Sequence, residues 1–61
     1  MHVLFEIDNG EQTEEFYFDG TPAEIRAAFL RYARMQFVAS VAVWNYENGT
    51  RLHYCDNLSN A

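Results

Sequence analysis

Residues 21–32 read TPAEIRAAFLRY and predict a helix with a well-marked beginning. Thr21 can cap the helix N-terminus, Pro22 suits the first helical position, and Glu24 completes a capping box with Thr21. Apolar residues then recur at the spacing of one helical face, at positions Ile25, Ala28, Phe29 and Tyr32. We therefore expect an amphipathic helix from Pro22 to about Met35, with one side packed against a core.

Two β-hairpins are predicted around this helix, because an Asn-Gly pair lies between alternating apolar and polar residues on each side of it. Asn-Gly favours a two-residue type I′ turn, in which both central residues have positive φ. In the first hairpin, a turn at Asn9-Gly10 would pair Val3 with Phe16. This pairing places five apolar side chains on one sheet face, namely Val3, Phe5, Ile7, Phe16 and Phe18.

The second hairpin begins with a strand at residues 37–44 that is apolar and β-branched on both sides. Such a pattern is typical of a central strand rather than an edge strand. A two-residue turn at Asn48-Gly49 would pair Val43 with Tyr54 and Trp44 with His53.

These elements predict an α+β fold of order ββαββ in a single domain at residues 1–55, followed by a flexible tail at 56–61. If the second hairpin docks against the first strand, the antiparallel sheet has the order 2-1-3-4, with the helix packed on one face. A domain of 61 residues buries only about 60% of the surface that its unfolded chain exposes. A partner or a second copy would therefore add useful stability.

The composition excludes several classes of protein. Hydrophobic residues make up 49% of the chain, which is too many for a disordered protein at a net charge of −5. The single cysteine, Cys55, cannot form an internal disulfide, and the first residues lack the pattern of a signal peptide. No apolar run approaches the roughly 18 residues of a transmembrane helix. We expect a cytoplasmic protein that does not bind membranes.

Negative charge is concentrated in the first 24 residues. This segment contains no lysine or arginine but has seven carboxylates, those of Glu6, Asp8, Glu11, Glu14, Glu15, Asp19 and Glu24. The remainder contains Arg26, Arg31, Arg34 and Arg51 against Glu47 and Asp56. Phosphates of nucleic acids and of lipids repel an acidic chain, so direct nucleic-acid binding is disfavoured and a basic protein surface is the natural complement. The same charge also serves solubility.

No catalytic or metal site is predicted. His53 and Cys55 lie two residues apart on a strand, where side chains stand about 6–7 Å apart, too far for the hydrogen bond between a nucleophile and its base. No histidine or cysteine pair has the spacing of zinc ligands, and no glycine-rich phosphate loop is present. We expect no enzymatic activity, no cofactor, no metal and no small-molecule substrate.

The predicted sheet face away from the helix is rich in aromatic and apolar side chains. One helix covers only one face of a four-stranded sheet, and an exposed apolar patch normally marks an interaction surface. Tryptophan, tyrosine and arginine are also enriched at binding hot spots. The residues assigned to this face are Leu4, Tyr17, Val38, Ala42, Trp44, Tyr46, Arg51 and His53. Cross-strand pairs such as Tyr46 with Arg51 would stabilise the sheet as well.

Two functional hypotheses follow. The leading one is a non-enzymatic protein–protein interaction module that forms a homodimer through this face. The alternative is an acidic inhibitor from a phage or mobile element, which imitates nucleic acid and blocks a basic nucleic-acid-binding protein. Its phosphate-like carboxylates would be those of Glu6, Asp8, Glu11, Glu15 and Asp19.

Overall fold

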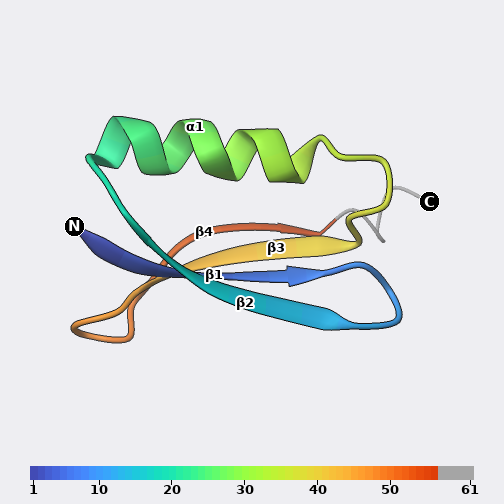
Figure 1. The fold of residues 1–61 in the computed structure, drawn as a ribbon, viewed down its shortest axis with the longest axis horizontal. Coiled ribbons are helices and arrows are strands. Elements are labelled where there is room, and N and C mark those ends of the chain that lie inside the picture. Colours follow the sequence, from blue (N-terminus) through green and yellow to red (C-terminus); the bar gives the residue numbers. More distant parts are fainter. Residues whose placement is uncertain (57–61) are drawn as a thin grey trace.

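The computed structural model describes residues 1–56, whose elements follow the predicted order. Helix α1 (Pro22–Ala33) lies over one face of a single sheet (Figure 1). The strands are β1 (His2–Asp8), β2 (Thr13–Asp19), β3 (Ser40–Asn45) and β4 (Arg51–Asp56). Their order is β2-β1-β3-β4 and every neighbouring pair is antiparallel, which confirms the predicted α+β class and strand order.

The beginning of α1 is the predicted capping box. The amide of Glu24 donates to Oγ1 of Thr21 (3.2 Å), and the amide of Thr21 donates to Oε1 of Glu24 (2.9 Å). The backbone hydrogen bond from Thr21, followed by its side-chain bond, lowers the pKa of the Glu24 carboxyl. The helix ends at Ala33, two residues earlier than predicted. No helix in the described part of the chain is long and apolar enough to cross a membrane.

The hydrophobic core lies between α1 and the sheet. Phe5 is fully buried at its centre, with its ring centroid 5.1 Å from that of Phe16, 5.6 Å from that of Phe18 and 5.9 Å from that of Tyr32. The other buried members of this cluster are Val3, Ile7, Ile25, Phe29, Val38, Val41 and Val43. The predicted apolar face of the first hairpin is therefore the face that packs under the helix.

The first hairpin has a longer loop than predicted. Val3 opposes Phe18, so its predicted pairing with Phe16 is wrong by two residues. The physical reason is that Oδ1 of Asn9 accepts hydrogen bonds from two later amides of the loop (3.0 and 2.8 Å), and only Gly10 has a positive φ (95°). Because the shift is even, every side chain keeps its predicted face.

The second hairpin loop is also held by an asparagine. Oδ1 of Asn45 accepts hydrogen bonds from the amides of Glu47 (2.9 Å) and Asn48 (3.4 Å), and the amide of Gly49 donates to the carbonyl of Asn45 (2.8 Å). Gly49 has a φ of 73°, whereas no residue other than glycine among residues 1–56 has a positive φ. Both Asn-Gly pairs therefore mark turns, but neither turn is of type I′.

A β-bulge changes the register of this hairpin between Val43 and Trp44. Val43 opposes His53 rather than Tyr54, and Trp44 opposes Arg51 rather than His53, so both predicted pairings are wrong. A one-residue change of register exchanges the two faces of a strand. His53 consequently lies on the helix-facing side, and its predicted place on the opposite face is wrong.

The connection from α1 to β3 differs from the prediction as well. The strand begins at Ser40, so Phe37 and Val38 precede it. Val38 is buried in the core cluster, and its predicted place on the outer sheet face is wrong. At the other end, β4 includes Asp56, one residue beyond the predicted domain boundary. The rest of the predicted tail, 57–61, lies outside the described residues.

Candidate protein-binding face

The side of the sheet away from α1 carries no other helix or strand among residues 1–56, and we call it the open face. The strand pairings arrange its side chains in rows that run from β2 to β4. One row is Tyr17, Leu4, Trp44 and Arg51; the next is Glu15, Glu6, Ala42 and Tyr54; a third is Thr13, Asp8, Ser40 and Asp56. One end of the open face is therefore aromatic, and the middle is acidic.

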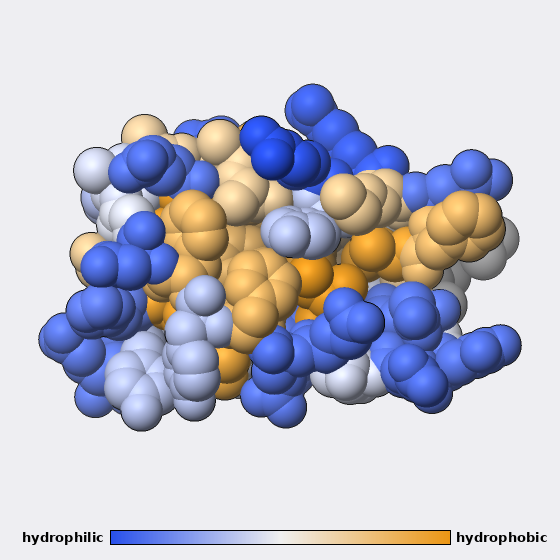
Figure 2. Space-filling model, in the orientation of Figure 1, coloured by the Kyte–Doolittle hydropathy of each residue, from blue (hydrophilic) through white to orange (hydrophobic). Residues whose placement is uncertain are grey.

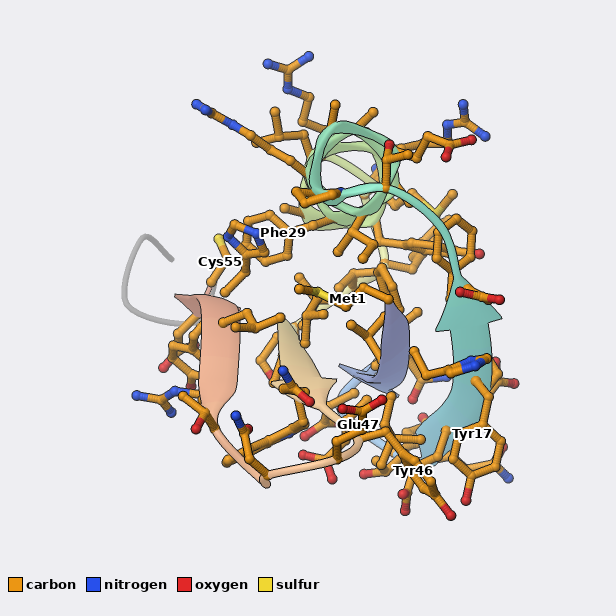
Figure 3. All side chains as sticks on the ribbon, turned by 90° about the vertical axis from the view of Figure 1, so that its left-hand side faces the viewer. Met1, Tyr17, Phe29, Tyr46, Glu47 and Cys55 are labelled. Carbon is orange, nitrogen blue, oxygen red and sulfur yellow. The ribbon has the colours of Figure 1, made fainter. Side chains whose placement is uncertain are left out.

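Two exposed tyrosines mark the aromatic end. Tyr17 is 70% exposed and Tyr46 is 60% exposed, and their rings meet edge to face with centroids 5.1 Å apart. Both project away from the helix side of the sheet in Figure 3. Leu4 and Trp44 lie opposite each other on the neighbouring strands and are half-buried. These four residues lie on the face to which the sequence assigned them.

Arg51 also lies on the open face, where it is held against aromatic rings. Its guanidinium carbon is 4.5 Å from the ring centroid of Tyr54 and 5.9 Å from that of Trp44. Tyr54 is 48% exposed and was missed by the sequence reasoning. Tyr54 opposes Ala42, which lies on the open face. The predicted register of the second hairpin did not include the β-bulge and therefore did not place Tyr54 there.

His53 belongs to the helix-facing side. Its ring stacks on that of Phe29, with centroids 5.0 Å apart and an angle of 24° between the planes. Cys55 lies on the same side of β4, opposite Val41, and is half-buried. In Figure 3, Phe29 and Cys55 both lie between α1 and the sheet. These side chains contribute to packing under the helix rather than to the open face.

Two carboxylates face each other in the acidic part of the open face. Glu6 on β1 directly opposes Glu15 on β2, and we call these two residues the carboxylate pair. Neither forms an ion pair within the described residues. On its other side Glu6 meets Ala42, a small residue that is 5% exposed. Like charges directly opposite each other destabilise a sheet, so this arrangement lowers the stability of the isolated chain.

The remaining acids of the second hypothesis are distributed unevenly. Asp8 lies on the open face next to the carboxylate pair along β1, and its Oδ1 accepts a hydrogen bond from the amide of Gly10 (2.8 Å). Asp19 lies at the other end of β2 and pairs with the amino group of Met1 (3.3 Å). Glu11 lies in the first hairpin loop, off the sheet. The structure thus groups Asp8 with the carboxylate pair and separates the other two acids from it.

Three of the four arginines lie on the opposite side of the molecule from the open face. Arg26 and Arg31 are exposed on α1, and Arg34 is exposed at its C-cap. Nitrogen-tipped side chains extend from the helix away from the sheet in Figure 3. The charge asymmetry that divides the sequence at about residue 24 therefore becomes an asymmetry between an acidic open face and a basic helix face.

A second exposed apolar surface lies beside the helix. It is a groove of about 420 Å³, and Figure 2 shows apolar surface between α1 above and the sheet edge of β2 below. Phe37 borders the groove and is 79% exposed. The other lining residues are Ile7, Asn9, Glu14, Tyr32, Met35, Gln36 and Val38. This apolar groove was not predicted, because it results from the early end of α1 and the irregular connection to β3.

Within residues 1–56, no three histidine, cysteine, aspartate or glutamate side chains are grouped so that they could hold a metal ion. No protein-family model matches the chain, and the searches of curated proteins and of solved structures found no match either. The function is therefore argued from the surface of the molecule alone.

Proposed function

We propose that this chain is a non-enzymatic interaction module whose open face binds a basic surface of a protein partner. The observation that carries the proposal is the carboxylate pair, which is opposed across two strands and has no cationic partner within the described residues. An arginine or lysine from a partner would remove the repulsion between the two carboxylates. Part of the binding energy therefore comes from relief of an unfavourable contact in the unbound chain.

The aromatic end of the open face is also suited to binding an arginine side chain of a partner. Guanidinium groups stack on aromatic rings and form bidentate hydrogen bonds with carboxylates. Arg51 already shows this stacking against Tyr54 within the chain. The exposed rings of Tyr17 and Tyr46 offer a partner arginine a similar contact beside the carboxylate pair.

The charge of the open face makes symmetric pairing of two copies the less favoured arrangement. Arg51 is the only arginine or lysine on this face among residues 1–56. Face-to-face packing would bring two copies of the carboxylate pair and of Asp8 into one interface. Like charges that approach each other in this way oppose association.

Inhibition of a nucleic-acid-binding protein is the second candidate, and the clustering of Asp8 with the carboxylate pair favours it. Opposed residues on paired strands have Cα atoms about 5 Å apart, and Asp8 lies about 6.6 Å further along β1 than Glu6. The three carboxylates can therefore occupy neighbouring phosphate positions on a basic protein surface. Competition by duplex DNA for the same partner is expected in this case.

The test uses a fluorescein-labelled peptide of nine arginines and fluorescence anisotropy at 20 mM and 300 mM salt. The double variant Glu6→Gln/Glu15→Gln should bind about 5- to 30-fold more weakly at 20 mM salt, equivalent to about 1–2 kcal/mol for two partly exposed charge pairs. The matched control is Glu11→Gln/Glu14→Gln, which removes the same net charge away from the open face. It should bind within about twofold of the unmodified chain.

Equal weakening in both double variants would show that the peptide responds to net charge and not to the open face. Binding that is unchanged at 300 mM salt would also contradict the proposal, because contacts between exposed charges are screened by salt.

A further inference from the structure

The outer side of α1 has the features of a second binding surface. Successive helical residues are turned by about 100°, which places Ala27 between Arg26 and Arg31 on the solvent side, while Leu30 is half-buried and packs partly against the core. Ala27, Leu30, Arg31 and Arg34 line a shallow hollow there. The small side chain of Ala27, flanked by guanidinium groups, allows an acidic surface to approach closely.

Arg26, Arg31 and Arg34 form no ion pair with an acidic side chain in the described part of the chain, although the chain contains nine aspartates and glutamates. The nearest acid in sequence, Glu24, uses its carboxylate in the capping box. The helix dipole favours cations in the last turn, which accounts for Arg31 and Arg34 but not for Arg26 in the first half of α1.

The basic helix face and the acidic open face also match in size. A helix of 12 residues is about 18 Å long, and a strand of 7 residues spans about 23 Å. Arg26 and Arg31 are separated by about 7.5 Å along the helix axis, and Glu6 and Asp8 by about 6.6 Å along β1. The inner face of the same sheet already accommodates one helix of this length, α1 itself.

We infer that the chain associates head to tail, with the outer side of α1 in one copy packed on the open face of the next. This inference rests on the proposed function and names a second copy as the basic partner. The two surfaces are different, so each added copy leaves one of each exposed, and association continues beyond the dimer. One helix on one sheet face buries less than a standard interface of about 1,600 Å², so the dissociation constant should be about 10–500 μM at low salt.

Sedimentation velocity of two complementary variants tests this arrangement. The helix-face variant is Arg26→Gln/Arg31→Gln, and the sheet-face variant is Glu6→Gln/Glu15→Gln. At about 500 μM and 20 mM salt, the unmodified chain should form species larger than dimers, and each variant alone should sediment as the 7.1 kDa monomer. A 1:1 mixture should form dimers and nothing larger, because only the open face of the first variant and the helix face of the second remain intact.

Three results would overturn the inference. They are an unmodified chain that stays monomeric, a mixture that stays monomeric, and a helix-face variant that still dimerises alone, as it would in face-to-face pairing. Circular dichroism of both variants verifies the fold, since all four substituted residues are at least partly exposed. If the nine-arginine peptide binds the open face while the unmodified chain stays monomeric, only head-to-tail association fails and the proposed function stands.

Discussion

Replacement of Glu6 by glutamine should stabilise the fold while it weakens binding of a basic partner. Glu6 and Glu15 oppose each other on neighbouring strands, so their carboxylates lie about 6 Å apart. Coulomb repulsion at that distance is about 0.7 kcal/mol in water, and salt at 0.15 M reduces it to about 0.3 kcal/mol. Glu6 is half-buried beside Ala42, where the effective dielectric constant is lower than in water. We therefore expect a gain of about 0.3–1 kcal/mol.

The assay is urea denaturation followed by the fluorescence of Trp44, the only tryptophan in the chain. In a thermal scan, the same gain corresponds to a rise in Tm of about 2–8 °C for a domain of this size. A double-mutant cycle with Glu15→Gln isolates the pair, since the second substitution should add little once the repulsion is gone. The gain should shrink at 1 M salt, where the Debye length falls to about 3 Å.

Glu11→Gln is the control, because Glu11 lies in the first hairpin loop and opposes no carboxylate. It should change the stability by less than about 0.3 kcal/mol. If Glu6→Gln leaves the stability unchanged at low salt, or lowers it, the carboxylate pair is not a source of strain. The proposal would then lose the observation on which it depends.

Further predictions concern the core, the helix cap and a turn. Phe5→Ala should cost about 3–5 kcal/mol, close to the whole stability of a domain this small, and a normal urea transition would contradict the placement of Phe5 at the core centre. Thr21→Ala should cost about 1 kcal/mol in the same assay. Because the pKa of Glu24 is lowered from 4.5 in the folded chain, its ionised form stabilises the fold above that pH. This contribution should be lost as the pH falls through the lowered value, and the loss should be absent from the pH profile of Glu24→Gln, whereas Thr21→Ala keeps the backbone hydrogen bond to Glu24 and should only reduce it. Gly49→Ala should cost about 1 kcal/mol, since φ is 73° there, and an unchanged urea midpoint would exclude the left-handed turn.

The elements that local chemistry specifies could be predicted from the sequence. Thr21, Pro22 and Glu24 specify the helix start, and the alternation around Phe5 specifies which side of β1 is buried. These two predictions depend only on contacts within a few residues or on a period of two. The strand order needed one further assumption, that the second hairpin docks against β1, and the structure confirms the order.

The register of the hairpins could not be predicted, because it depends on which amides the asparagine side chains bind. Asn9 and Asn45 each hold a longer loop than an Asn-Gly turn suggests. In the first hairpin the predicted register was wrong by two residues, which leaves every side chain on its predicted face of the sheet. In the second, a bulge moved His53 under the helix and Tyr54 onto the open face.

The carboxylate pair was missed for the same reason. A two-residue turn at Asn9-Gly10 would have placed Glu6 opposite Thr13, a neutral partner, whereas the longer loop places it opposite Glu15. The strongest functional feature of the open face thus depends on a shift of two residues. The apolar groove beside Phe37 likewise depends on where α1 ends, and the sequence did not predict that end correctly.

The most direct test of the binding face is a titration of the ¹⁵N-labelled chain with the nine-arginine peptide, followed by two-dimensional NMR. The largest shift changes should occur at the amides of Glu6, Glu15 and Tyr17 and at the indole N–H of Trp44, with smaller changes on α1. Shift changes that concentrate instead around Phe37 in the apolar groove would contradict the assignment of the open face as the binding surface. A titration without any shift change would contradict it equally.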